Sequence, residues 1–285
     1  MLSYLKGKSA LTTILNNTKH IGILGCGWLG QALAKKLISN HYKVKATTTR
    51  FEKLEALKKI GVNAYQIELK PDIVSGDLDD FLNDLDVLIM AVPPQLKKGH
   101  DYFYKALKYV FANYDLSALK KIIYISSTGV FADGLEKTYD ENSKPNNKSL
   151  RGKKLIALEE LVLIQNQLQH PIILRYGGLI EHNGRHPVHF LSGKENIPHP
   201  EAPVNLIEQS DAVNLLLNIV DQSHKSNIYH GVNPNHPTRQ DYYSKKAKTL
   251  NLSPPKFDFS NTSKGKNVSS DLTQKILGFS YDYGI

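Results

Sequence analysis

The sequence predicts an α/β fold in which a doubly wound parallel sheet carries a small C-terminal lobe. An apolar run ends at Gly25-Cys26-Gly27-Trp28-Leu29-Gly30 and passes directly into a helical pattern. Apolar segments then alternate with amphipathic ones as far as about residue 175, and beyond it this alternation stops. Strands that are apolar throughout and alternate with helices are typical of a parallel sheet covered on both faces.

The loop at the end of this first apolar run has the pattern G-x-G-x-x-G, which indicates dinucleotide binding when a strand precedes it and a helix follows. Gly25 permits a tight turn, Gly27 leaves room for a diphosphate, and Gly30 lets helix and strand pack closely. The first N–H groups of the helix then face the phosphates. We therefore predict cofactor contacts from these three glycines and from Trp28 and Leu29.

The elements of the first half follow from short apolar runs and from amphipathic stretches between them. Strands are expected at Ile21–Leu24, Lys43–Thr48, Ala64–Leu69, Asp86–Val92, Lys121–Ser126 and Pro171–Arg175. Helices are expected at Gln31–Ser39, Phe51–Ile60, Leu78–Leu85, Tyr102–Asn113 and Leu155–Gln169. Gly61 closes the second helix, and Pro93-Pro94 stop the fourth strand.

The second half begins with a segment, Gly177–Pro203, that is rich in Gly, Pro, His and Asn and has little periodicity. Later elements are expected at Asp211–Val220 (helix), Asn227–Val232 (strand), Thr238–Leu250 (helix) and Val268–Leu277 (helix). We predict an N-terminal extension (1–18) and a dinucleotide-binding Rossmann domain (19–176). Residues 177–285 mainly form a substrate-binding lobe, with about 211–232 returning to the sheet. Substrates of open α/β sheets bind at the carboxyl ends of the strands.

Composition narrows the class of protein. The chain has 285 residues, 41% of them hydrophobic and 22% charged, which is ordinary for a soluble globular protein. Its one cysteine excludes an internal disulfide framework and fits the reducing cytoplasm. The first residues are too polar for a secretory signal, and no apolar run is long enough for a membrane span. The net charge of +9 is spread over helix faces, which favours an anionic small molecule over nucleic acid.

The end of the second strand indicates which dinucleotide binds. An NAD site usually has Asp or Glu there to bind the ribose hydroxyls. Here the chain reads Thr47-Thr48-Thr49-Arg50, and hydroxyls followed by a guanidinium suit a 2′-phosphate. Thr49 and Arg50 therefore predict NADP, with NAD as the alternative. We also expect Ala91, Val92 and Pro93, at the end of the fourth strand, to flank the cofactor.

The segment Ile123–Phe131 (IYISSTGVF) resembles the extended short-chain dehydrogenases/reductases, the group of NAD-dependent epimerases and dehydratases. Three further segments are similar to that family: Ile172–Ile180 with Gly184-Arg185, Val204–Ile207 with Asp211, and Asn233–Tyr243. The resemblance covers about residues 20–280. It implies a small-molecule substrate such as a nucleotide sugar or another hydroxy or carbonyl compound. In this family a helix pair often builds a dimer, so a homodimer is one expected assembly.

The resemblance also implies which residues act. A hydroxyl after the fifth strand binds the substrate oxygen, which points to Ser127 with Thr128 beside it. The family's Tyr-x-x-x-Lys pair, which transfers the proton, is absent: alignment on Glu159 puts Arg151 and Leu155 in its place, and alignment on Lys154 puts Leu150 at the tyrosine position. Arginine is not a base at physiological pH, but it can hold an anionic substrate. We expect substrate contacts from Arg151, Gly178, Arg185 and Asn205.

Two functions remain open. One is an NADP-dependent oxidoreductase or epimerase-like enzyme in which Ser127 or Thr128 polarises the substrate oxygen. The other is a non-catalytic NADP-binding sensor or scaffold, which the missing Tyr-Lys pair favours. A metal site is not expected, because Gly184 and Pro187 prevent His182, His186 and His189 from sharing one helix face. The sequence also lacks the G-x-S-x-G pattern of serine hydrolases.

Overall fold

A computed structural model describes residues 18–93, 99, 101–134, 137–165, 168–182, 184–223, 226–260 and 265–285. Its centre is a seven-stranded sheet of order β12-β9-β7-β6-β1-β2-β3, in which every neighbouring pair is parallel. These strands are β1 (His20–Leu24), β2 (Lys43–Thr48), β3 (Asn63–Gln66), β6 (Val87–Met90), β7 (Lys121–Ser127), β9 (Pro171–Tyr176) and β12 (Ile228–Gly231). The chain reverses its direction of travel between β1 and β6, so the predicted doubly wound sheet is confirmed.

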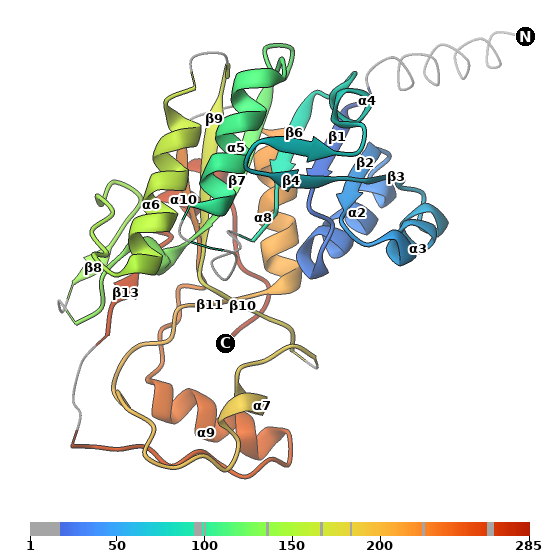
Figure 1. Ribbon diagram of the computed structural model, residues 1–285. Helices are drawn as coiled ribbons and strands as arrows, with labels where there is room; N and C mark the ends of the chain where they lie inside the picture. Colours follow the sequence, from blue (N-terminus) through green and yellow to red (C-terminus); the bar gives the residue numbers. More distant parts are fainter. Residues whose placement is uncertain are drawn as a thin grey trace, which may run out of the picture.

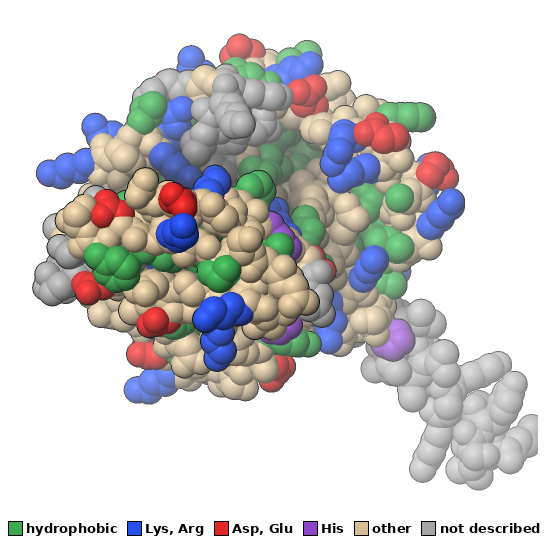
Figure 2. Space-filling model, turned by 90° about the horizontal axis from the view of Figure 1, so that it is seen from below, with side chains coloured by type: hydrophobic (Ala, Val, Ile, Leu, Met, Phe, Trp, Pro, Cys, Tyr) green, Lys and Arg blue, Asp and Glu red, His purple; other side chains and the backbone are tan. Residues whose placement is uncertain are grey.

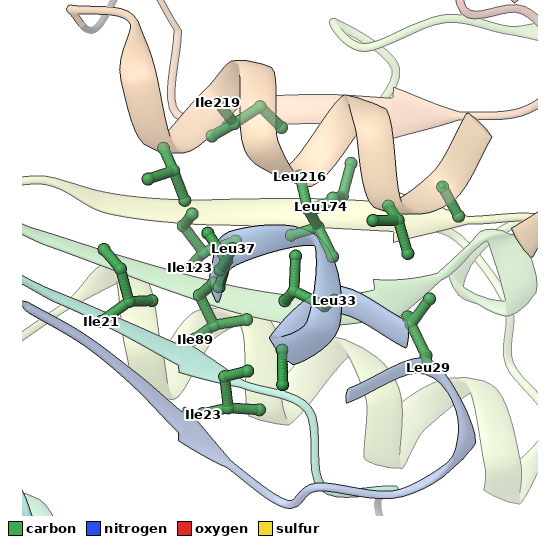
Figure 3. Close-up of a cluster of buried hydrophobic side chains, with 14 of the residues drawn as sticks. Ile21, Ile23, Leu29, Leu33, Leu37, Ile89, Ile123, Leu174, Leu216 and Ile219 are labelled. Atoms are coloured by element: carbon green, nitrogen blue, oxygen red, sulfur yellow. The ribbon is translucent and has the colours of Figure 1, made fainter. Parts of the chain in front are cut away.

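Helices cover both faces of the sheet (Figure 1). One face carries α2 (Trp28–Ser39), α3 (Leu54–Lys59), α8 (Gln209–Asp221) and α10 (Asp271–Leu277). The other face carries α4 (Leu78–Leu82), α5 (Tyr102–Asn113) and α6 (Leu150–Leu163). Alternate strand residues serve the two layers: Val87 and Ile89 pack on the first, and Leu88 and Met90 on the second. Figure 3 shows the first layer, where side chains of α2 and α8 meet those of the strands.

A small lobe lies beyond the carboxyl ends of the strands, at the bottom of Figure 1. It contains α7 (Val188–Leu191) and α9 (Arg239–Thr249), which enclose a separate apolar cluster that includes Tyr242 and Tyr243. Three two-stranded pairs complete the structure: β4 (Glu68–Lys70) with β5 (Ile73–Ser75), β8 (Thr138–Tyr139) with β13 (Asn267–Val268), and β10 (Gly178–Ile180) with β11 (Leu206–Glu208). No helix of the described residues is long and apolar enough to cross a membrane.

Some element boundaries differ from those predicted. The strand at Lys43–Thr48 and the helix at Tyr102–Asn113 are confirmed with the predicted bounds. The helix expected from Leu155 already begins at Leu150, because the Ser149 hydroxyl caps it by accepting the Gly152 N–H at 3.1 Å. The last helix begins at Asp271 rather than Val268, because Asn267 and Val268 pair with β8.

Another difference concerns the third predicted strand of the sheet. The expected strand Ala64–Leu69 is divided into β3 and the start of the β4–β5 pair. The predicted N-terminal extension lies outside the described residues except for Thr18. In the second half, α8 packs on α2 and β12 pairs with β9 at the edge of the sheet.

Candidate functional site

The glycine-rich loop joins β1 to α2 at the carboxyl edge of the sheet. Gly25 has φ +98°, a conformation that L side chains rarely adopt, and a Cβ there would lie 2.8 Å from Val92 Cγ2. A Cβ on Gly30 would lie 2.9 Å from the Gly25 carbonyl oxygen. Both positions therefore require glycine for the loop itself to form.

The open face of this loop is at Gly27, where a Cβ would meet nothing within 4 Å. The loop is fixed from behind by Thr47, whose hydroxyl accepts the Gly25 N–H at 2.9 Å and whose carbonyl accepts the Cys26 N–H at 2.7 Å. The first turn of α2 has no acidic residue and no capping side chain. Bare backbone at a helix N-terminus fits a diphosphate, so the residues present suit a dinucleotide.

A cavity of about 440 Å³ opens in front of this loop. The molecule is hollowed between the lobe and the sheet domain when it is seen from below (Figure 2). The lining comes from the ends of four strands, from α6 and from the lobe: Leu24–Gly30, Thr47–Arg50, Lys53, Ile67, Leu69, Ala91–Pro93, Ile125–Ser127, Arg151, Leu155, Leu179 and Arg185. Among these described lining residues, every charged side chain is a cation. The cavity is therefore electrostatically suited to an anionic ligand.

The β2 end of the cavity contains the residues expected to choose between NAD and NADP. Thr48, Thr49 and Arg50 all line it, and the Thr48 hydroxyl accepts the Arg50 N–H at 3.2 Å. Glu52, in the 3₁₀ turn Phe51–Lys53, does not line it; its carboxylate lies 4.0 Å from Arg50 Nε, and because both side chains are mostly exposed this contact is weak and leaves Arg50 available to a ligand. Lys53 does line it and was not predicted from the sequence. The sequence feature that could have indicated Lys53 is its position about one turn after Arg50.

Ser127, at the β7 end of the cavity, is on its wall. Its hydroxyl oxygen accepts the Gly129 N–H at 3.1 Å, which leaves the hydroxyl proton for another acceptor. Thr128 is buried, 6% exposed, and does not line the cavity. Of the two predicted hydroxyls, the structure therefore brings only Ser127 to the cavity.

A buried ion pair connects α6 to β9 next to the β7 end of the cavity. The Arg175 guanidinium on β9 donates to both carboxylate oxygens of Glu159 on α6, with Nη2 to Oε2 at 2.7 Å and Nε to Oε1 at 3.0 Å. The Ser126 hydroxyl donates to Glu159 Oε1 at 2.5 Å. Both charged side chains are at most 4% exposed. This pair fixes α6 against β7 and β9 immediately behind Ser127.

The start of α6 supplies Arg151 and Leu155, which both line the cavity. Residues four apart lie on the same face of a helix, so this face is the one turned to the cavity. The resemblance places the catalytic Tyr and Lys of the family at these two positions. Here they are an arginine and a leucine, so this wall contains no group that accepts a proton at neutral pH.

The lobe contributes Arg185, whose guanidinium carbon lies 5.3 Å from the centre of the Trp28 ring. The Trp28 indole N–H also donates to Glu181 at 3.4 Å, so lobe and glycine loop are in contact. Gly178 and Asn205, the other predicted substrate residues, are outside the described lining of this cavity. Gly178 instead donates its N–H to the Asn205 carbonyl at 2.7 Å.

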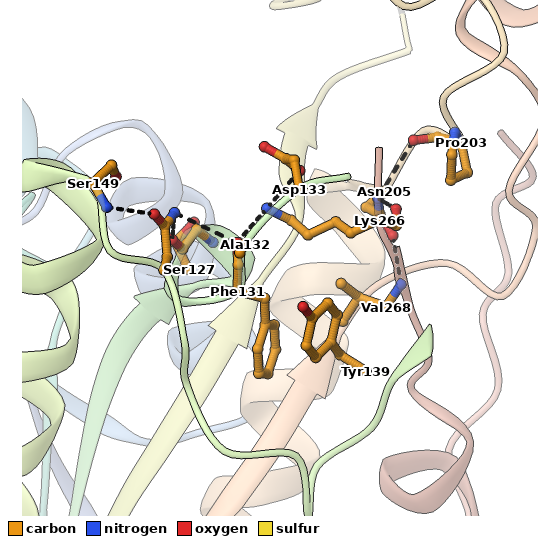
Figure 4. A network of polar contacts seen from close by, with 12 residues as sticks. Ser127, Phe131, Ala132, Asp133, Tyr139, Ser149, Pro203, Asn205, Lys266 and Val268 are labelled. Carbon is orange, nitrogen blue, oxygen red and sulfur yellow. Dashed lines mark hydrogen bonds and ion pairs between the residues drawn. The ribbon is translucent and has the colours of Figure 1, made fainter. Parts of the chain in front are cut away.

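The Asn205 side chain holds the lobe to the sheet domain. Its amide donates to the Lys266 carbonyl at 2.9 Å and its oxygen accepts the Val268 N–H at 2.9 Å. Lys266 in turn reaches the Phe131 carbonyl at 2.8 Å and the Asp133 carboxylate at 3.1 Å (Figure 4). Asn205 borders a separate cavity of about 180 Å³. Since its amide is already used, Asn205 acts as a structural connector.

Two histidines are buried in different parts of the molecule. His186 Nδ1 accepts the Val188 N–H at 3.1 Å, and Nε2 lies 2.9 Å from the Tyr242 hydroxyl in the lobe. His230, on β12, bonds the Ser269 carbonyl at 2.8 Å. Burial lowers the pKa of each to about 4. Among the described residues, no group of three or more His, Cys, Asp or Glu side chains is placed to hold a metal ion.

The chain is a Rossmann-fold protein whose cavity lies at the carboxyl ends of the strands, where open α/β sheets bind their ligands. A family model described as "NADP oxidoreductase coenzyme F420-dependent" matches residues 20–99, the half of the sheet that contains the glycine loop. The chain is 32% identical over 270 residues to Protein YeeZ of Escherichia coli K12, an alignment that covers 93% of this chain and 96% of that one. It belongs to the same family as YeeZ.

Solved structures with the same fold include several sugar-nucleotide proteins. A functionally unknown conserved protein of Silicibacter pomeroyi superposes with a TM-score of 0.75 at 18% identity, over 93% of this chain and 94% of that one. MoeE5 in complex with UDP-glucose and NAD gives 0.72 at 17%, over 93% and 94%. UDP-glucuronic acid 4-epimerase of Bacillus cereus, with UDP-glucuronic acid and NAD, gives 0.71 at 16%, over 93% and 95%. The extended short-chain dehydrogenase/reductase fold expected from the sequence is confirmed.

Proposed function

We propose that this protein binds NADP(H) in the cavity at the carboxyl edge of the sheet and uses it on a small-molecule substrate. One observation carries the proposal: the described lining combines the open backbone at Gly27 with four cations, Arg50, Lys53, Arg151 and Arg185, and no carboxylate. A dinucleotide supplies the negative charge that this arrangement lacks. The protein is then an oxidoreductase or epimerase-like enzyme, and its buried single cysteine suits the cytoplasm.

The preference for NADP rests on the β2 end of the cavity. Arg50 and Lys53 are one turn apart, and the hydroxyls of Thr48 and Thr49 lie beside them. Guanidinium and ammonium groups with hydroxyl donors bind a 2′-phosphate dianion, whereas an NAD site offers a carboxylate to the ribose. NAD is the alternative, because MoeE5, which shares the fold, was solved in complex with NAD.

The reaction proposed uses Ser127 to bind the substrate oxygen. The cofactor supplies hydride chemistry when it is bound. Since the Ser127 oxygen accepts from Gly129, its proton is left for donation to a carbonyl or hydroxyl oxygen. Arg151 cannot replace a tyrosine base, so the proton that the carbonyl oxygen takes up on reduction, or that the hydroxyl releases on oxidation, must come from or pass to solvent. Substrates of this class are small hydroxy or carbonyl compounds, with nucleotide sugars suggested by the solved relatives.

A second function is favoured by the Arg151 and Leu155 positions. A protein that binds the cofactor without a proton-transferring pair can act as a sensor of the NADP(H) pool or as a scaffold. The two functions share the same binding site and differ only in turnover.

Binding is tested by titrating the protein with NADPH and NADH while the fluorescence of Trp28, the one tryptophan of the chain, is followed. We expect quenching by NADPH at lower concentration than by NADH. Arg50→Ala should weaken NADPH binding about tenfold or more and change NADH binding little, as expected for a charge-assisted contact. Lys58→Ala, an exposed cation outside the cavity lining, is the matched control. No quenching and no thermal shift with either cofactor would contradict both functions.

Turnover separates the enzyme from the sensor. A panel of carbonyl compounds and nucleotide sugars is screened by the loss of NADPH absorbance, with Ser127→Ala as the site variant. An enzyme should show substrate-dependent oxidation that Ser127→Ala reduces about a hundredfold, the cost of one oxyanion donor. A substrate-dependent rate that this variant leaves unchanged would remove Ser127 from the mechanism.

A further inference from the structure

The four cations of the cavity come from three places. Arg50 and Lys53 follow β2, and Arg185 comes from the lobe, where it lies over the Trp28 ring. Arg151 is the second residue of α6, next to the end of β7 where Ser127 lies. In the sheet, β1 and β6 stand between β2 and β7. A dinucleotide in a doubly wound sheet places its two halves over the two sides of this switch point. If the proposed function holds, the 2′-phosphate takes Arg50 and Lys53, and the nicotinamide half lies on the side of Arg151.

Arg151 lacks a counter-charge at this position. Among the described residues, no carboxylate pairs with it, and the described cavity lining contains none. The first turn of α6 has no acidic residue, although acids are the residues that a helix N-terminus favours. Lys153 and Lys154 follow directly in the sequence, and Lys154 donates to the Gly99 carbonyl at 3.1 Å. Arg151 is exposed and no described carboxylate pairs with it, so its guanidinium is available to an anion at the cavity wall.

In this proposed arrangement the nicotinamide end of the cofactor does not neutralise Arg151. An oxidised nicotinamide ring is itself positively charged and a reduced ring is neutral, so neither offers a negative group on this side. We infer that Arg151 binds the anionic group of a second small molecule, a carboxylate or a phosphate, beside Ser127. The guanidinium takes two oxygens of such a group, and the Ser127 hydroxyl is then close to the rest of the molecule. This inference deepens the proposed function and names the charge of its substrate or effector.

A consequence concerns the two redox forms of the cofactor. With no anion present, Arg151 repels the charged oxidised ring and leaves the neutral reduced ring unaffected. The wild-type protein should therefore bind NADPH more tightly than NADP⁺, and an anion on Arg151 should reduce this difference. Repulsion between two like charges in a partly solvated cavity changes the ratio of the two affinities about three- to tenfold.

The test uses Arg151→Met, which retains the bulk of the side chain, and Lys153→Met as the matched control. Lys153 lies in the same turn but does not line the cavity. Dissociation constants for NADPH and NADP⁺ are measured for each variant. Malonate, its uncharged diamide and inorganic phosphate are then titrated into the NADPH-saturated proteins while nicotinamide fluorescence is followed. Malonate represents a carboxylate ligand and phosphate represents a phosphate ester.

We expect malonate or phosphate, but not the diamide, to change the fluorescence of the wild-type and Lys153→Met complexes. Arg151→Met should weaken that anion at least tenfold and lower the preference for NADPH over NADP⁺ about three- to tenfold. Equal responses of Arg151→Met and wild type in both measurements would overturn the inference, as would anions that only displace NADPH. Because the anion titrations are made on NADPH-saturated protein, absence of NADPH binding would contradict the proposed function instead.

Discussion

The carboxyl edge of the sheet and the small lobe use similar polar residues in opposite ways. At the sheet edge, consecutive residues after β1, β2, β6 and β7 line one cavity, and side chains such as Arg50 and Arg151 face it. In the lobe and its connection, Asn205 and His186 bond main-chain groups or a neighbouring side chain. The difference teaches that a polar side chain is available for a ligand only where its own hydrogen bonds have not already been used.

The largest effect on stability should come from breaking the buried Glu159–Arg175 ion pair behind the cavity. Glu159→Ala leaves the Arg175 guanidinium buried without its carboxylate, which should lower the free energy of unfolding by about 3–5 kcal/mol. Urea denaturation measures this. The double variant Glu159→Met/Arg175→Leu is the control, since it removes both charges and should recover most of the loss. A single variant as stable as the wild type would show that this pair does not stabilise the site.

A second substitution should weaken cofactor binding much more than it affects stability. Gly27→Val adds a side chain whose Cβ meets nothing within 4 Å, but Gly27 is the N-cap of α2, where valine is disfavoured, so stability should fall by about 1 kcal/mol while the protein stays folded. The same side chain occupies the diphosphate position and should weaken NADPH binding about a hundredfold, or about 2.7 kcal/mol. Thermal unfolding and NADPH titration measure the two quantities. Unchanged NADPH affinity in a folded variant would place the cofactor elsewhere.

A substitution of Asn205, which connects the lobe to the sheet domain, should have the reverse effect: it should lower stability and leave NADPH affinity nearly unchanged. Asn205→Ala removes two hydrogen bonds to the Lys266 and Val268 main chain, at a cost of about 1–2 kcal/mol of unfolding free energy. NADPH affinity should stay within about twofold, because Asn205 does not line the cofactor cavity. Denaturation and titration of the same preparation test both parts. A large loss of affinity with normal stability would return Asn205 to the binding site.

The smallest effect is a pH dependence that both regions share. His186 and His230 have pKa values lowered from 6.5 to about 4, so between these values the unfolded chain binds more protons than the folded one. Stability should therefore fall as the pH drops below 6.5, by less than about 1 kcal/mol per histidine at pH 6. Denaturation at pH 7.5 and pH 6 measures this, and His186→Gln should remove part of the slope. A wild-type stability that rises on acidification would contradict this origin.

The same comparison explains what the sequence could predict. The loop from Gly25 to Gly30 and the run Thr47–Arg50 are local signals, since each lies at the end of a strand that the sequence itself predicts. The Arg175–Glu159 pair and the Asn205 connections join segments far apart in the chain, and no local pattern shows them. Lys53 was missed because its approach to the cavity depends on the 3₁₀ turn after Arg50.

The central claim is that the cavity at the sheet edge is an NADP(H) site, and a crystal structure of the protein with NADPH tests it most directly. We predict the diphosphate at the N-terminus of α2 against Gly27, the 2′-phosphate between Arg50 and Lys53, and the nicotinamide ring facing Ser127. A dinucleotide bound outside this cavity would contradict the claim. A 2′-phosphate directed into solvent, away from Arg50 and Lys53, would contradict the preference for NADP.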